Sequence, residues 1–213
     1  MRVSRKGTRP ASFQNAAEGS NRRIPAPSTT NKDDRSFTSI VSCKEVITDL
    51  IQIRRLGEKK RGENEKFRRW IKSHNFVERQ FRAAAKEVHA AIDCRECAEC
   101  CRVTEAEIFE KDVVSLSKNL GISRQQFLEK YTQAGTDGEL ILKRTEEAGC
   151  VFLDGNDCTI YEFRPKTCEG FPHLLRGMGS IQHKMWAYVD RATDCPIVYN
   201  WMEQAKDLTN FKK

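Results

Sequence analysis

The sequence lacks several features that would assign it to common classes of protein. No run in its 213 residues approaches the ~20 apolar residues that a membrane-spanning helix requires. Nothing near Met1 resembles the apolar core of a secretory signal, which argues against a disulfide-rich exported protein. We therefore expect a cytoplasmic protein that does not bind a membrane.

Charge and cysteine are distributed in opposite ways along the chain. Residues 1–93 carry 21 basic and 11 acidic side chains, whereas residues 94–213 carry 16 and 19. Eight of the nine cysteines lie in the second part. A basic surface can bind nucleic acid, but basic side chains on the solvent faces of helices are the ordinary arrangement. Nucleic acid is therefore not an expected partner, and a protein partner stays open.

Residues 1–35 are rich in Ser, Thr, Asn, Pro and Arg and contain few apolar side chains. Such a segment cannot offset the entropy of ordering, so we predict a disordered basic tail. Its excess of arginine over acidic residues also suits an organellar transit peptide.

Residues 36–92 are predicted to form a helical extension. Apolar residues recur at helical spacing from Ile40 to Ile51, and they place Cys43 in the core rather than among the ligands. The charged stretch 54–66 is interpreted as a solvated turn. Beyond a break at residues 73–75, a second apolar stripe consists of Val77, Phe81, Ala84, Val88 and Ile92.

Residues 93–208 are predicted to form a small cysteine-cluster domain of α+β class, with short strands and flanking helices. A capping-box pattern at residues 104–107 predicts a helix that Gly121 ends, and Ser123 starts another. Residues 164–172 are interpreted as a loop, and Pro196 begins a final helix. Strand-like runs occupy residues 139–144, 150–153 and 158–161, with a hairpin turn at residues 154–157.

The cysteines carry the chemistry of this sequence. A C-x2-C-x2-C-C motif is followed by four more cysteines, so that the set is Cys94, Cys97, Cys100, Cys101, Cys150, Cys158, Cys168 and Cys195. Thiolates two residues apart can turn toward one point, and soft thiolate ligands select zinc or iron–sulfur clusters. A disulfide framework fits less well, because no export signal is present and a bridge between adjacent cysteines is strained. The eight cysteines therefore predict metal binding.

The spacing leaves the metal open between zinc and iron. Three cysteines at x2 intervals with a remote Cys-Pro are typical of the run that holds a [4Fe–4S] cluster in bacterial ferredoxins. Zinc ribbons use two C-x2-C pairs, and the second pair is missing here. Eight thiolates can nevertheless hold two tetrahedral zinc ions. The sequence narrowly favours a [4Fe–4S] cluster, with Cys94, Cys97, Cys100 and Cys195 as its ligands.

Adjacency and helix position refine this hypothesis. Cys100 and Cys101 are neighbours, so they are not expected to chelate one mononuclear ion together, which suits two sites or a cluster with a second metal. Cys195 at a helix start is expected to have its thiolate stabilised by the helix dipole. The four histidines show no paired spacing with the cysteines and are interpreted as structural, with His173, close to Cys168, as the best candidate for an exception.

Three segments resemble the YkgJ-like CxxCxxCC cysteine-cluster family, a zinc- or iron-chelating domain. They are DCRECAECCR (residues 93–102), GCVFLDGNDCTIYEFRPKTCEGFP (149–172) and DCPIVYNWMEQAK (194–206). The resemblance implies that all eight cysteines occupy the family's metal-binding positions and that Arg164 and Pro165 match its RP element. Cys43 lies outside it, and Glu99 stands where many members have Gly.

The expected function is to bind zinc or iron in a structural or redox role. One branch of the family is fused or related to flagellin lysine N-methylases, so an enzyme or accessory protein of lysine N-methylation is the alternative. The chain has no Gly-rich strand-to-helix loop for a methyl donor, and the sequence favours the absence of enzymatic activity. No catalytic residue and no cofactor beyond the metal are predicted.

Overall fold

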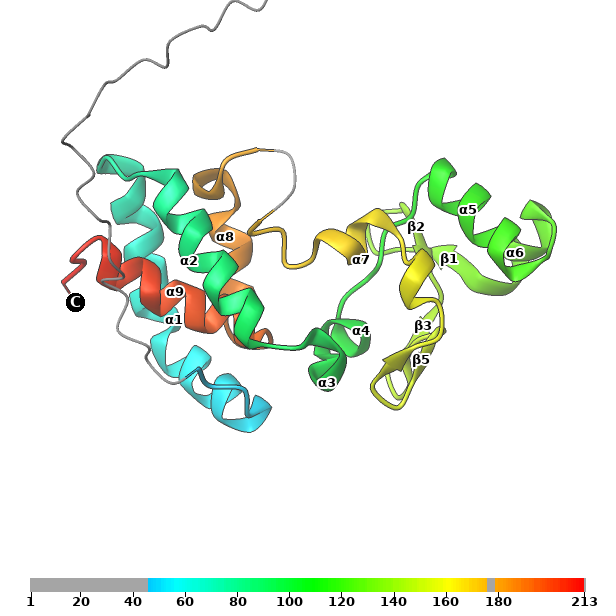
Figure 1. The fold of residues 1–213 in the computed structure, drawn as a ribbon, viewed down its shortest axis with the longest axis horizontal. Helices are drawn as coiled ribbons and strands as arrows, with labels where there is room; N and C mark the ends of the chain where they lie inside the picture. Colours follow the sequence, from blue (N-terminus) through cyan, green and yellow to red (C-terminus); the bar gives the residue numbers. More distant parts are fainter. Residues whose placement is uncertain (1–45, 176–178, 213) are drawn as a thin grey trace, which may run out of the picture. The chain divides into compact units, whose positions relative to one another are not determined.

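The computed structural model describes residues 46–175 and 179–212 of the chain (Figure 1). The predicted α+β class is confirmed, because most of the described residues are helical and the strands pair as small antiparallel sheets. The predicted tail at residues 1–35, together with Ile40 and Cys43, lies outside the described residues. Within the described ranges, no helix combines the length and the hydropathy needed to cross a membrane.

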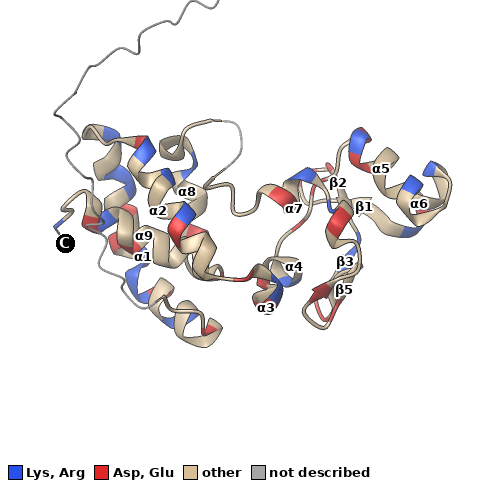
Figure 2. Ribbon diagram, in the orientation of Figure 1, with Lys and Arg blue, Asp and Glu red and all other residues tan. Residues whose placement is uncertain are grey.

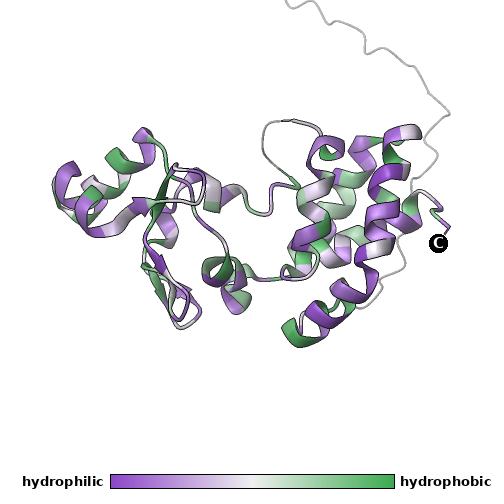
Figure 3. Ribbon diagram, turned by 180° about the vertical axis from the view of Figure 1, so that it is seen from behind, coloured by the Kyte–Doolittle hydropathy of each residue, from purple (hydrophilic) through white to green (hydrophobic). Residues whose placement is uncertain are grey.

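Four helices surround the larger hydrophobic core: α1 (Leu50–Ser73), α2 (Glu78–Ala91), α8 (Ile181–Arg191) and α9 (Pro196–Leu208). Figure 3 shows hydrophobic and hydrophilic residues mixed in this part of the molecule. Helices α1, α2 and α8 bury spaced residues, as amphipathic packing requires, whereas α9 is buried over its first seven residues. Trp201 is fully buried in this core, where its ring meets Phe81 and Tyr188 at centroid separations of 6.0 and 5.2 Å. Its indole N–H donates to the carbonyl of Phe81 at 2.9 Å. The sequence predicted the helices at α2 and α9 but not α8.

Helix α1 runs straight through the charged stretch 54–66, so the predicted solvated turn is wrong. Arg61 pairs with Glu58 and Arg68 with Glu65, each one turn apart. Figure 2 shows basic and acidic residues along α1. A Cβ on Gly57 would come within 2.5 Å of the Ala192 oxygen. This glycine therefore marks the close approach of α1 to the end of α8 rather than a turn.

The start of α1 also differs from the predicted helical stripe. Residues 46–49 are not helical, and the Asp49 carboxylate caps the helix by accepting from the Gln52 N–H at 2.7 Å. Ile51 is consequently 82% exposed, while Ile53 is fully buried. The predicted break at residues 73–75 is confirmed, and the second stripe is buried except for Val77 at its start.

Cys195 lies in the larger core at the start of α9, and the other seven cysteines among the described residues lie in a second region, built from short elements. Its helices are α3 (Cys94–Cys97), α4 (Glu99–Val103), α5 (Glu110–Leu120), α6 (Arg124–Tyr131), the 3-10 turn η1 (Tyr161–Phe163) and α7 (Lys166–Gly170). Its three antiparallel sheets are β1–β2 (Thr132–Ala134, Leu140–Leu142), β3–β4 (Arg144–Thr145, Gly149–Cys150) and β5–β6 (Leu153–Asp154, Asp157–Cys158). A smaller core that includes Leu116, Phe127 and Phe152 supports them.

Several predicted boundaries in this region are confirmed. Gly121 ends α5 with a φ of 67°, in the left-handed region where glycine is favoured. Ser123 caps α6 by accepting from the Gln126 N–H at 3.1 Å. The hairpin turn at residues 154–157 joins β5 to β6, with Leu153 opposite Cys158. Strand β1 was not predicted.

Three predictions in this region are wrong. The capping box at residues 104–107 does not start a helix, because Ile108 N–H donates to Leu140 O at 2.9 Å and this stretch pairs along β2 instead. The run 158–161 leaves the strand after Cys158, since residues 161–163 form η1. The predicted loop 164–172 contains α7, which follows directly on Pro165.

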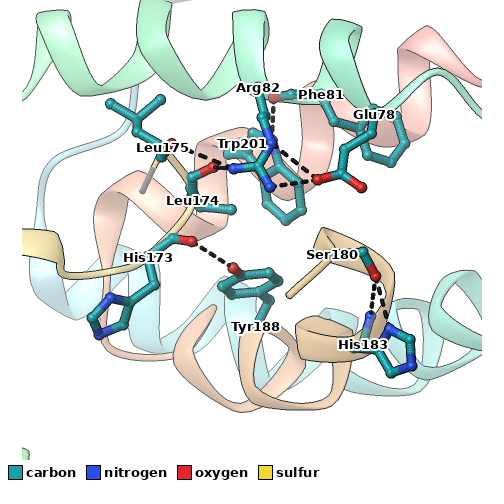
Figure 4. A network of polar contacts seen from close by, with 10 residues as sticks. All are labelled: Glu78, Phe81, Arg82, His173, Leu174, Leu175, Ser180, His183, Tyr188 and Trp201. Carbon is teal, nitrogen blue, oxygen red and sulfur yellow. Dashed lines mark hydrogen bonds and ion pairs between the residues drawn. The ribbon is translucent and has the colours of Figure 1, made fainter. Parts of the chain in front are cut away.

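The segment after α7 is held by polar contacts to the larger core (Figure 4). The Arg82 guanidinium donates to the carbonyls of Leu174 and Leu175 at 3.2 and 3.3 Å. The Tyr188 hydroxyl donates to the carbonyl of His173 at 3.0 Å. These bonds connect the chain that follows Cys168 to α2 and α8.

Candidate metal centre

Helices α3 and α4 carry the C-x2-C-x2-C-C motif on two turns separated by Ala98. Asp93 caps α3 by accepting from the Arg95 N–H at 2.8 Å. Ala98 adopts a φ of 49°, which bends the chain between the two helices. Glu99 is buried, and its carboxylate accepts from Arg54 of α1 at 2.8 Å.

Strand β4 brings Cys150 against α4. Gly149 has a φ of 72°, and a Cβ at this position would lie 2.7 Å from the Cys101 oxygen and 2.8 Å from the Arg102 Cα. Only glycine lets the two backbones approach this closely. The Arg144 guanidinium fixes the same contact by donating to the Arg102 carbonyl at 2.7 Å.

The β5–β6 hairpin brings Cys158 toward α3 and α4 in a similar way. Arg102 donates to the carbonyls of Cys97 and Gly155 at 3.0 and 2.8 Å and to Asn156 Oδ1 at 2.5 Å. Asn156 in turn donates to the Glu96 carbonyl at 2.9 Å. A single guanidinium thus joins the turn of the hairpin to the cysteine motif.

Cys168 and Cys195 complete the set from α7 and from the N-cap of α9. Burial raises the pKa of each thiol to about 12. The backbone N–H groups of Val198 and Ile197 bond to the Cys195 sulfur and lower its pKa, but burial outweighs them. The N–H groups at the start of α9 thus favour the Cys195 thiolate, as its position predicts, while burial acts in the opposite direction and is the larger effect.

The eight thiols face two adjoining cavities. A small cavity of about 40 Å³ is lined by Cys94, Cys97, Cys100 and Cys195. A larger one of about 430 Å³ is lined by Cys94, Cys100, Cys101, Cys150, Cys158 and Cys168. None of these eight cysteines forms a disulfide. The structure therefore brings together all the sequence-predicted ligands, with Cys94 and Cys100 on the boundary between the cavities.

The electrostatics of the site centre on Cys101. A hydrogen bond from the Cys100 thiol lowers the pKa of Cys101, and the same contact raises the pKa of Cys100. The positive charges of Arg102 and Arg164 lower the pKa of Cys101 further. Burial raises the pKa of Cys94, Cys97, Cys150 and Cys158.

Arg164 of the RP element lies beside the larger cavity. Its guanidinium stacks on the Tyr161 ring at 3.8 Å from the centroid. Its Nε is buried and has no hydrogen-bond partner among the described residues. A half-buried cation next to several thiols offsets negative charge that accumulates there.

The eight free thiols are the kind of ligand that zinc and iron prefer, but their sulfur atoms are not arranged around a common point. Within residues 46–175 and 179–212, no three Cys, His, Asp or Glu side chains are already arranged to hold an ion. Thiols must lose their protons and their sulfurs must turn inward when a metal binds. His173 lines neither cavity, whereas His89, which the sequence did not single out, lines the larger one.

The comparisons agree with this chemistry. Residues 93–196 match the model of the CxxCxxCC family, described as "Putative zinc- or iron-chelating domain". The chain carries a CxxCxxCC domain. All eight cysteines of the two cavities lie inside the match, and Cys43 lies outside it. No solved structure is significantly similar to the chain.

The CxxCxxCC domain also depends on residues that the sequence analysis did not single out. Gly149 and Arg102 position Cys150 and Cys158 against α4, and Arg54 holds Glu99. Gly149 and Arg102 have a neighbour that could have served as a signal, since Gly149 directly precedes Cys150 and Arg102 directly follows Cys101. The partners that Arg54 and Arg102 contact in other parts of the fold are 45 to 54 positions away in the chain, which no local pattern reveals.

Proposed function

We propose that the CxxCxxCC domain binds zinc or iron through the thiolates of its eight cysteines and serves a structural or redox role. The observation that carries this proposal is the convergence of eight free thiols on two adjoining cavities. Soft thiolate donors of this number select zinc or iron among the biological metals. The domain extends, in this proposal, over residues 93–208, after the helical extension at residues 36–92.

An iron–sulfur cluster is narrowly preferred over two zinc ions. The C-x2-C-x2-C spacing and the Cys195-Pro196 pair support a [4Fe–4S] cluster. Two zinc ions remain the competing occupants, since zinc readily occupies four-thiolate sites. Anaerobic purification followed by iron, zinc and sulfide analysis decides between them: a brown protein with acid-labile sulfide supports the cluster, and a colourless zinc protein supports the alternative.

Cysteine variants test whether the eight thiolates are the ligands. We expect Cys97→Ser to lower the metal content and the soluble yield, because metal binding and folding are coupled in such domains. Cys43→Ala is the matched control, since it also removes one thiol but lies outside the CxxCxxCC match. Equal metal loss in both variants, or a wild-type protein that binds neither metal, contradicts the proposal.

A further inference from the structure

The cavities divide the eight cysteines in a way that the sequence alone left open. We propose that the thiolates form two separate four-cysteine sites, divided between the adjacent residues Cys100 and Cys101. The first site consists of Cys94, Cys97, Cys100 and Cys195, and the second of Cys101, Cys150, Cys158 and Cys168. This inference rests on the proposed function and specifies how the metal is held.

The cavity linings separate most of the ligands without ambiguity. Cys97 and Cys195 line only the small cavity. Cys101, Cys150, Cys158 and Cys168 line only the larger one. Cys94 and Cys100 border both, and assigning them to the small cavity completes four ligands on each side. Four thiolates are the number that a tetrahedral metal site or a cubane cluster requires.

Helix geometry explains why the division falls between two neighbours. Cys100 and Cys101 both lie in α4, where successive side chains point about 100° apart around the axis. Gly149 brings the β4 backbone onto the Cys101 carbonyl, next to Cys150 on the same strand. We therefore infer that Cys101 lies on the face of α4 that packs against the strands. Cys100 then faces the cysteines of α3 and the start of α9.

The two sites differ in their surroundings. The first is closed, since Cys195 is only 8% exposed and the cavity measures about 40 Å³. The second adjoins a cavity of about 430 Å³ that is lined in part by Arg164 and Tyr161. This volume is in the range of small-molecule sites. Metal in the first site should therefore exchange more slowly than metal in the second.

Cadmium-113 NMR of the full-length protein tests the division, because ¹¹³Cd²⁺ alone serves as the probe for thiolate sites. The wild-type protein should show two separate resonances. Cys100→Ser and Cys101→Ser form a matched pair: the same substitution, at adjacent residues of one helix. Each variant should lose about half of the bound cadmium, since each site holds four ligands, and each should lose a different resonance.

A second pair keeps the test valid if a variant in α4 does not fold. Cys97→Ser should remove the same resonance as Cys100→Ser, and Cys158→Ser the same one as Cys101→Ser. Loss of the same resonance in Cys100→Ser and Cys101→Ser, or loss of both resonances in every variant, overturns the division into two sites. The proposed function still holds in that case if the wild-type protein binds cadmium. A wild-type protein that binds no cadmium, zinc or iron overturns the proposed function itself.

Discussion

The two cores of the molecule differ in size and in the residues that support them. The larger core joins α1, α2, α8 and α9 and buries large side chains such as Trp201, Tyr188 and Phe67 completely. The smaller core, in the cysteine region, is supported by strands of two or three residues. Isolated two-stranded hairpins are marginally stable in water.

This difference indicates what stabilises each region. Apolar burial can stabilise the four helices without a ligand, because each buried aromatic side chain contributes about 1.5–3 kcal/mol. Around the thiols, polar contacts add to a small apolar cluster: Arg102, Arg144 and Asn156 hold backbone carbonyls together. The cysteine region should therefore depend on its metal, and the four-helix core should not.

Removal of the metal should produce the largest effect and the clearest separation of the two regions. Binding of a structural zinc ion contributes on the order of 10 kcal/mol to folding in small metal domains. We expect a chelator to abolish hydrogen-exchange protection in α3, α4 and β3–β6 while the helices of the larger core keep theirs. Equal loss of protection in α2 and α9 would contradict the comparison.

Trp201→Ala should damage the other region. The substitution removes a fully buried ring that contacts Phe81 and Tyr188, together with its hydrogen bond to the Phe81 carbonyl. Large-to-small core substitutions of this kind cost about 3–5 kcal/mol. The expected result in urea is a lower unfolding midpoint for the helices of the larger core. Trp186→Ala, at a tryptophan of α8 that is 64% exposed, is the control and should leave the midpoint nearly unchanged.

Two glycines of α1 test how closely the larger core is packed. Gly57→Ala places a Cβ 2.5 Å from the Ala192 oxygen, and we expect it to cost about 1–3 kcal/mol through overpacking. At Gly62 nothing lies within 4 Å, so Gly62→Ala should stabilise the helix by about 0.5–1 kcal/mol. Thermal unfolding of the two variants should shift in opposite directions. A stabilising Gly57→Ala would show that α1 and the end of α8 are not in close contact.

The same glycines show where sequence reasoning succeeds and where it fails. Apolar spacing predicted α2 because it packs a regular stripe against one core, and Pro196 with the apolar residues after it predicted α9. The glycines and charges of α1 led to the prediction of a turn. That prediction is wrong because Gly57 is required by a close contact with Ala192, which lies far along the chain. Helix α8 has a regular pattern of its own, with Ser180 as its cap, and could have been predicted.

In the candidate site, sequence reasoning identified the thiols but not their grouping. Cysteine types and spacing are local, so all eight could be named as candidate ligands. Which cavity each thiol faces depends on the approach of β4 to α4, and that approach requires Gly149 and Arg144. Likewise, the dipole argument for Cys195 was local, whereas burial by the surrounding chain is the larger influence on its pKa.

Substitutions of Arg102 should have the smallest effect, and they test whether polar contacts stabilise the cysteine region separately from the larger apolar core. Arg102→Ala removes bonds to the Cys97 and Gly155 carbonyls and to Asn156. We expect a cost of about 1–2 kcal/mol, the low end for bonds to a charged group because this guanidinium is partly exposed. That cost should appear as weaker metal binding rather than as a change in the urea midpoint of the larger core. Arg102→Lys keeps the charge but loses the planar fork. If Lys restores the metal affinity, charge near Cys101 is what Arg102 contributes; if it does not, the hairpin contacts are the reason.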